Sequence, residues 1–120
     1  MPLKSVALAA LTEHHRRGLF DDVIPFWLRH GSDREHGGLL TGLNRDGTVI
    51  DTDKAIWLQG RAAWTFGTLC NTAKPRGEWI ELAKSCLAFI RTHARGPGGK
   101  LYFTVTREGR PLRKIGRAHV

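Results

Sequence analysis

The sequence lacks long apolar runs and has few cysteines. No stretch approaches the about 20 consecutive apolar residues of a membrane-spanning helix, so we expect no membrane association. Cys70 and Cys86 form no C-x-x-C pair, and both fall on apolar faces of predicted helices. We expect two buried free thiols in a reducing compartment, which favours a cytoplasmic protein. The N-terminal MPLKSVALAA runs directly into charged residues, so it is interpreted as the start of an amphipathic helix rather than a signal peptide.

Several functional patterns are also missing. None of the six histidines has a metal-site spacing such as H-E-x-x-H. The net charge of +8 raises the question of nucleic acid, but the basic residues are scattered and form no stripe interleaved with aromatics. No pair of carboxylates stands out for glycoside hydrolysis. We therefore expect no metal and no nucleic-acid partner.

Apolar spacing predicts three helices. The first covers residues 5–30, is interrupted at Gly18 and Pro25, and ends at Gly31. The second covers residues 54–71 and is apolar nearly all round, so it needs cover on more than one side. The third runs from Trp79 to about Ala94 and is amphipathic, hence covered on one side.

Turn signals predict two β-hairpins between the helices. Residues 37–50 place two short β-type runs around N-R-D-G, and residues 100–106 form a strand that an R-E-G turn connects to a second strand near Pro111. Three residues with short oxygen-bearing side chains precede the second helix, and we expect them to cap it: Asp51, Thr52 and Asp53.

The chain contains a weak internal repeat. GGLLTGLNRDG at Gly37 and GGKLYFTVTREG at Gly98 share a glycine pair, a β run and an Arg-acid-Gly turn, at an offset of 61 residues. Each copy follows a helix, so the repeated unit combines a one-sided helix, a hairpin and a buried helix. Such units must stack to bury their apolar faces, and the alternation of buried and half-buried helices fits two concentric layers.

The last seven residues, KIGRAHV, are similar to an in-frame translation of a common short-read sequencing adapter. We expect residues 114–120 to be a non-native tail and residues 1–113 to be the N-terminal part of a longer protein.

An arginine lies in the middle of the apolar second helix. Trp57, Arg61 and Trp64 stand at i, i+4 and i+7, so they form one line along the helix. A buried guanidinium keeps its charge and needs partners. Either Arg61 pairs with a buried acid, or it extends outward to solvent, or it faces a cavity and binds a polyhydroxylated or anionic ligand. In the last case, Trp57 and Trp64 offer flat apolar faces to a sugar ring.

Three segments carry a resemblance to a known family. DREHGG (33–38), NRDGTVIDTDKAIWLQGRAAWTF (44–66) and REGRPL (107–112) resemble the N-terminal part of the N-acylglucosamine 2-epimerase family, which includes the mammalian renin-binding proteins. The resemblance implies an (α/α)6 barrel with short β-hairpins between helices, and an activity that interconverts N-acetylglucosamine and N-acetylmannosamine through the C2 proton. It also implies a cytoplasmic homodimer that acts on a small amino sugar, requires no cofactor and takes ATP as an activator.

The resemblance also assigns roles to residues. The family's acid–base histidines lie in the C-terminal half, so no catalytic residue is expected in this chain. Arg61 corresponds to the family's active-site arginine and is expected to bind substrate, with Trp57, Trp64 and Gln59 as further contacts. Gln59 and Lys54 are also candidates to support Arg61 or the hairpin.

Two other functions stay open. One is a related sugar 2-epimerase or aldose–ketose isomerase acting on mannose, glucose or cellobiose. The other is a protein-binding module, as the renin-binding name suggests.

Overall fold

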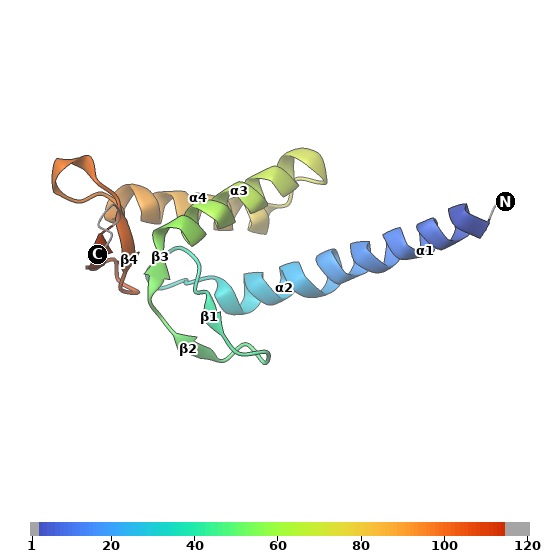
Figure 1. The fold of residues 1–120 in the computed structure, drawn as a ribbon, viewed down its shortest axis with the longest axis horizontal. Coiled ribbons are helices and arrows are strands. Elements are labelled where there is room, and N and C mark those ends of the chain that lie inside the picture. Colours follow the sequence, from blue (N-terminus) through green and yellow to red (C-terminus); the bar gives the residue numbers. More distant parts are fainter. Residues whose placement is uncertain (1–2, 115–120) are drawn as a thin grey trace.

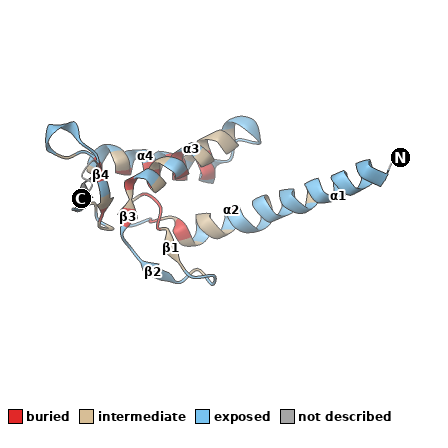
Figure 2. Cartoon of the chain, viewed as in Figure 1, coloured by how far each residue is buried: buried red, intermediate tan, exposed pale blue. Residues whose placement is uncertain are grey.

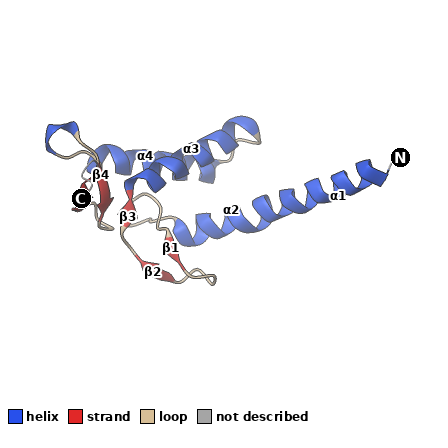
Figure 3. Ribbon diagram, in the orientation of Figure 1, coloured by secondary structure: helices blue, strands red, loops and turns tan. Residues whose placement is uncertain are grey.

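The computed structural model describes residues 3–114, and the side chains of residues 3–112, as a mainly helical chain with short strands between the helices (Figures 1 and 3). Residues 115–120 of the expected non-native tail lie outside the described residues. None of the helices within residues 3–114 is long and apolar enough to cross a bilayer. In chain order the elements are α1 (Leu3–Arg17), η1 (Gly18–Val23), α2 (Ile24–Phe26), η2 (Trp27–Gly31), β1 (Gly42–Leu43), β2 (Val49–Asp51), β3 (Lys54–Ala55), α3 (Ile56–Thr72), α4 (Gly77–His93), η3 (Pro97–Gly99), β4 (Tyr102–Val105) and β5 (Pro111–Lys114). Of these, η1 and η2 are π-helical, and η3 is a 3-10 turn.

The first predicted helix forms one helical path from Leu3 to Gly31 with two wide turns. One π-helical segment begins at Gly18, and the other follows Pro25, which has no N–H to donate and crowds the preceding turn. The path ends at Gly31, as predicted, because Ser32 is extended. Its first part, α1, buries no residue and projects away from the other elements (Figures 1 and 2).

The start of the second helix differs from the prediction. The helix begins at Ile56, its N-terminus has no side-chain cap, and Lys54–Ala55 form β3 instead. Asp51 lies in β2, where its carboxylate accepts a hydrogen bond from the Asp53 N–H at 2.9 Å. The capping prediction was wrong because antiparallel pairing of β3 with β4 holds Lys54 in an extended conformation.

Helices α3 and α4 pack against each other and form most of the core. The bounds of α4 match the prediction within about two residues, and Trp79, Leu82, Ala83, Cys86 and Phe89 lie on its buried face. The core cluster that they share combines the small Ala62, Ala63 and Ala83 with larger side chains such as Phe66 and Trp79. Within the described residues α3 is covered on one side only, whereas its composition predicted cover on more than one side. The buried side carries Ile56, Gln59, Ala62, Ala63 and Phe66.

The predicted hairpins are both present, and the internal repeat extends to their backbone geometry. β1 pairs with β2, and β4 pairs with β5 and β3. The glycine pairs Gly37–Gly38 and Gly98–Gly99 all have left-handed φ angles between 77° and 84°. An isolated antiparallel bridge spans each glycine pair, Ser32 to Leu39 in the first copy and Arg95 to Leu101 in the second.

A histidine and a turn glycine meet in each copy of the repeat. Gly47 and Gly109 have φ angles of 92° and 103°, and a Cβ on either would come within 2.3 Å or less of the ring of His30 or His93 respectively. Each ring also packs against the phenylalanine one turn earlier, at centroid distances of 5.0 Å and 4.7 Å. The helix end and the hairpin turn of each unit are thus joined by the same contact.

We expect Gly109→Ala to lower the free energy of unfolding by about 1–3 kcal/mol, because alanine is strained at this φ and its Cβ would displace His93. The control is Gly67→Ala in the middle of α3, where no atom lies within 4 Å of the added Cβ. That change should stabilise by about 0.5–1 kcal/mol. Urea unfolding of both variants measures the difference, and equal effects would contradict the described turn.

Candidate functional site

Trp57, Arg61 and Trp64 lie together on the exposed face of α3. With Gly60 they line an open, shallow hollow of about 600 Å³. The tryptophan residues are 59 % and 61 % exposed, which is unusual for side chains of this size. The predicted line along the helix is therefore present, and in the described part of the chain no other element covers this face of α3, which was predicted to be covered on more than one side.

The Arg61 guanidinium lies over the Trp64 ring, with 5.0 Å between Cζ and the ring centroid. Such stacking restrains the side chain while leaving its N–H groups at the edge of the plane. Among the described residues no acid lies within ion-pair distance of Arg61. The alternative of a buried acid partner is thus not what the described residues show, and Arg61 is exposed and lines the hollow.

Gln59 lies on the opposite, buried face of α3. It is fully buried, its Nε2 donates to the Leu39 carbonyl at 2.8 Å, and its Oε1 accepts from the Leu39 N–H at 2.8 Å. Both ends of the amide are therefore engaged by the loop that leads into the first hairpin. The prediction that Gln59 contacts substrate does not fit this arrangement, whereas the predicted support of the hairpin does.

A buried ion cluster joins three segments that are distant in sequence: the loop that contains Asp33, the strand β3 with Lys54, and the turn that contains Arg107. The Lys54 Nζ donates to the Asp33 carboxylate at 2.7 Å, to the Gly37 carbonyl at 2.7 Å and to the Arg107 carbonyl at 3.0 Å. The Lys54 and Asp33 side chains are completely buried. Arg107 also donates to Asp33, from Nε at 3.0 Å and from Nη2 at 3.2 Å.

The hydrogen bonds decide the charge state of the cluster. Burial alone would raise the pKa of the Asp33 carboxyl, but the hydrogen bonds from Arg107, Lys54 and the His36 N–H together hold that pKa well below its usual range. Burial lowers the pKa of Lys54, and the neighbouring Asp33 carboxylate opposes this effect. The three hydrogen bonds of Lys54 use all three ammonium protons, which a buried cation requires.

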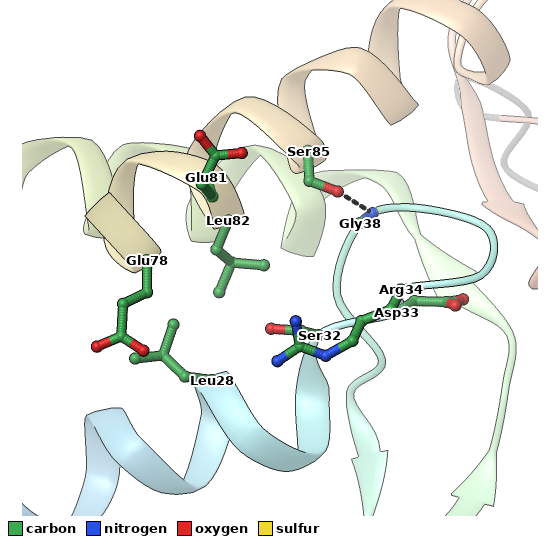
Figure 4. A pocket seen from close by; sticks show the side chains of 9 residues that line it. All are labelled: Leu28, Ser32, Asp33, Arg34, Gly38, Glu78, Glu81, Leu82 and Ser85. Atoms are coloured by element: carbon green, nitrogen blue, oxygen red, sulfur yellow. Dashed lines mark hydrogen bonds between the residues drawn. The ribbon is translucent and has the colours of Figure 1, made fainter. Parts of the chain in front are cut away.

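A second hollow of about 360 Å³ lies between α4, η2 and the loop after Gly31 (Figure 4). Figure 4 shows Leu28 and Leu82 beside it, with the Arg34 and Glu78 side chains at its edges. Here the Ser85 Oγ accepts a hydrogen bond from the Gly38 N–H at 2.9 Å. None of the predicted site residues lines this hollow, so it is separate from the hollow beside Arg61.

Cys70 and Cys86 are free thiols and lie outside the ion cluster and the hollow beside Arg61. Burial raises the pKa of the Cys86 thiol to about 11, so this group stays protonated at neutral pH. Cys70 is a free thiol that is only half-buried, which corrects the prediction that both thiols are buried. Among residues 3–114, no group of three or more His, Cys, Asp or Glu is placed to hold a metal ion.

Comparison with known proteins tests the resemblance of the three motif segments. The family model described as N-acylglucosamine 2-epimerase (GlcNAc 2-epimerase) matches residues 7–118. The chain belongs to the N-acylglucosamine 2-epimerase family. The three segments that carry the resemblance contain Asp33, Lys54, Arg61 and Arg107, so the ion cluster and the exposed arginine both fall within them.

Curated members of the family are similar over most of this chain. The N-acylglucosamine 2-epimerase of Rattus norvegicus is 43 % identical over 97 residues, and that of Homo sapiens is 40 % identical over 97 residues. Each match covers 78 % of this chain and 23 % of the relative. The chain thus spans about a quarter of the length of these relatives.

Solved structures of sugar epimerases contain a region with the same fold as this chain. A sugar epimerase from a ruminal bacterium is 28 % identical, with a TM-score of 0.74 over 85 % of this chain and 26 % of that one. The cellobiose 2-epimerase from Spirochaeta thermophila DSM 6192 has a TM-score of 0.80 at 23 % identity, over 94 % of this chain and 28 % of that one. The mainly helical arrangement with interposed hairpins is therefore that of solved sugar epimerases.

The sequence indicated Lys54 as a possible support of Arg61 or the hairpin, but it did not indicate the ion cluster that Lys54 forms with Asp33 and Arg107. Asp33, Lys54 and Arg107 are separated by 21 and 53 positions, so no local spacing connects them. The available signal was a lysine directly before the apolar run A-I-W-L, since a charge at the start of a buried segment needs a partner.

We expect Asp33→Asn to lower the free energy of unfolding by about 3–5 kcal/mol near neutral pH, because Lys54 stays buried without its counter-ion. The folded-state pKa of Asp33 is depressed, so its stabilising contribution is complete above the ordinary carboxyl pKa and is lost as the pH falls below about 4. Acid titration of stability should therefore be flatter in the variant. The exposed Asp46→Asn serves as control, and an equal loss there would contradict the assignment.

Proposed function

We propose that this chain is part of a sugar 2-epimerase that interconverts N-acyl-D-glucosamine and N-acyl-D-mannosamine, and that the exposed face of α3 contacts the sugar. The observation that carries the proposal is the line of Trp57, Arg61 and Trp64 on the face of α3 opposite its buried side. Curated relatives about 40 % identical to this chain carry the name of that activity. In the (α/α)6 barrel that we propose for the whole protein, this face looks into the central cavity.

The residues suit a sugar in two ways. An indole ring presents a flat apolar face to the C–H side of a hexose, and Trp57 and Trp64 are exposed enough to do so. The Arg61 guanidinium offers several N–H donors in one plane to the oxygens at the ring edge. Stacking on Trp64 holds the guanidinium in advance, so less freedom is lost on binding.

The reaction needs groups that this face lacks. Removing the C2 proton beside the C1 aldehyde and returning it on the other face requires an acid–base group on each side of the sugar. His30 and His93 pack against the hairpin turns and do not line the hollow. We assign the acid–base pair to residues of the whole protein other than these, and we assign to Arg61 the stabilisation of charge on the enolate oxygen.

Two expectations about the whole protein stay predictions. The family resemblance supports ATP as an activator and assembly as a homodimer. Neither ATP nor a partner is needed for the role given to Arg61.

A chimera tests the proposal. This chain's segment replaces the matching 97 residues of the Rattus norvegicus relative, and NMR follows exchange of the C2 proton of N-acetylmannosamine with deuterium from solvent. We expect exchange by the chimera and none by the 120-residue chain alone. In the chimera, Arg61→Lys should lower kcat/KM by about 10²-fold or more, because lysine lacks the planar donor set.

The control variant is Arg91→Lys, which changes an exposed arginine on α4 and should keep full exchange. A folded chimera without exchange would contradict the proposed function. Unchanged kcat/KM in Arg61→Lys would remove this residue from the site. Capture of a protein partner by a folded but inactive chimera would favour the binding-module alternative.

A further inference from the structure

The Gln59 amide connects the first turns of α3 to another segment through hydrogen bonds of defined geometry. Of the described side chains between Ile56 and Phe66, that of Gln59 is hydrogen-bonded through both of its polar atoms, and both bonds reach the same residue of another segment, Leu39. The helix N-terminus has no side-chain cap that would fix its direction. The pair of bonds to Leu39 imitates the pairing of two strands, so it restrains sliding as well as rotation of the helix.

The loop on the other side of this contact is closely fitted to it. A Cβ on Gly38 would lie 2.6 Å from the Gln59 Oε1, and Gly38 has a left-handed φ of 78°, so glycine is required here. Ser85 on α4 accepts from the Gly38 N–H at 2.9 Å. The loop is therefore held from α3 by Gln59 and from α4 by Ser85.

Gln59 and Arg61 lie on opposite faces of the same turn. At about 100° per residue, two positions separate their side chains by about 200° around the helix axis. Any rotation of α3 that loosens the Gln59 amide from Leu39 therefore moves the Arg61 guanidinium by a similar angle. The stacking of Arg61 on Trp64, one turn further along, moves with the helix and does not resist this rotation.

We propose that Gln59 is a positioning residue for Arg61: its paired hydrogen bonds to Leu39 set the rotation of α3 and thereby the place where the guanidinium meets the sugar. The inference rests on the proposed function for its effect on turnover. Its geometric part concerns this chain alone and is tested separately.

The decisive variant is Gln59→Glu, which keeps the shape of the side chain. At a pH above the pKa of the new carboxyl group, the carboxylate has no proton to donate to the Leu39 carbonyl, and the two oxygens repel each other. Below that pKa, the protonated carboxyl donates one hydrogen bond and accepts the other, as the amide does. In the chimera, kcat/KM of the variant divided by kcat/KM of the unsubstituted protein should be about 0.1 or less at alkaline pH. This ratio should return toward one at acid pH.

The control is Ser85→Ala, which loosens the same loop from the side of α4 without touching α3. It should lower thermal stability, and because it introduces no titratable group, its effect on kcat/KM should be the same at every pH. If Gln59→Glu in an active chimera shows a ratio that does not vary with pH, or no greater loss than Ser85→Ala, the positioning role is overturned while the proposed function stands.

A spectroscopic measurement on the 120-residue chain tests the geometry without turnover. The Nε–Hε NMR signal of Arg61 reports its position over the Trp64 ring and its exposure to the hollow. We expect this signal to shift with pH in Gln59→Glu and to show no such pH-dependent shift in Ser85→Ala. A signal that is unmoved in both variants would overturn the inference, even if the unsubstituted chimera shows no exchange.

Discussion

The arrangement of this chain depends on one buried cation. The Lys54 ammonium is completely buried, so it must find acceptors inside the protein, and it finds them on three segments: the Asp33 carboxylate, the Gly37 carbonyl and the Arg107 carbonyl. The ammonium also lies 4.4 Å from the centre of the Phe89 ring. The loop after the first helical path, the start of α3 and the turn of the second hairpin are thereby tied to one point.

This constraint explains how a helix of apolar composition presents an arginine between two exposed tryptophan residues. Lys54 fixes the point where α3 begins, and Gln59 fixes one side of the helix against the loop at Leu39. The line of Trp57, Arg61 and Trp64 must then point away from the core. The sugar face that we propose is thus a consequence of how the opposite face is held, and the two cannot be altered independently.

Local pattern predicted much of this fold. Apolar spacing identified α4 within about two residues, and N-R-D-G and R-E-G located both hairpin turns. Spacing also placed Trp57, Arg61 and Trp64 on one line. Spacing could not show whether the helix face that carries these residues points toward the core or away from it, because that depends on contacts with residues far along the chain. For the same reason Asp51, Thr52 and Asp53 were predicted as caps: pairing of β3 with β4, 50 or so residues away in sequence, overrides the local capping signal.

The most direct test of this account is a double-mutant cycle on the buried pair, with Lys54→Met, Asp33→Asn and both changes together, measured by denaturant unfolding. Asp33→Asn leaves the Lys54 ammonium buried without its counter-ion, and Lys54→Met leaves the buried Asp33 carboxylate with Arg107 but without the ammonium. The double change removes the buried pair. We predict that the double variant loses less stability than the sum of the single variants, by about 2 kcal/mol or more. Additive losses would contradict the claim that this ion pair organises the three segments.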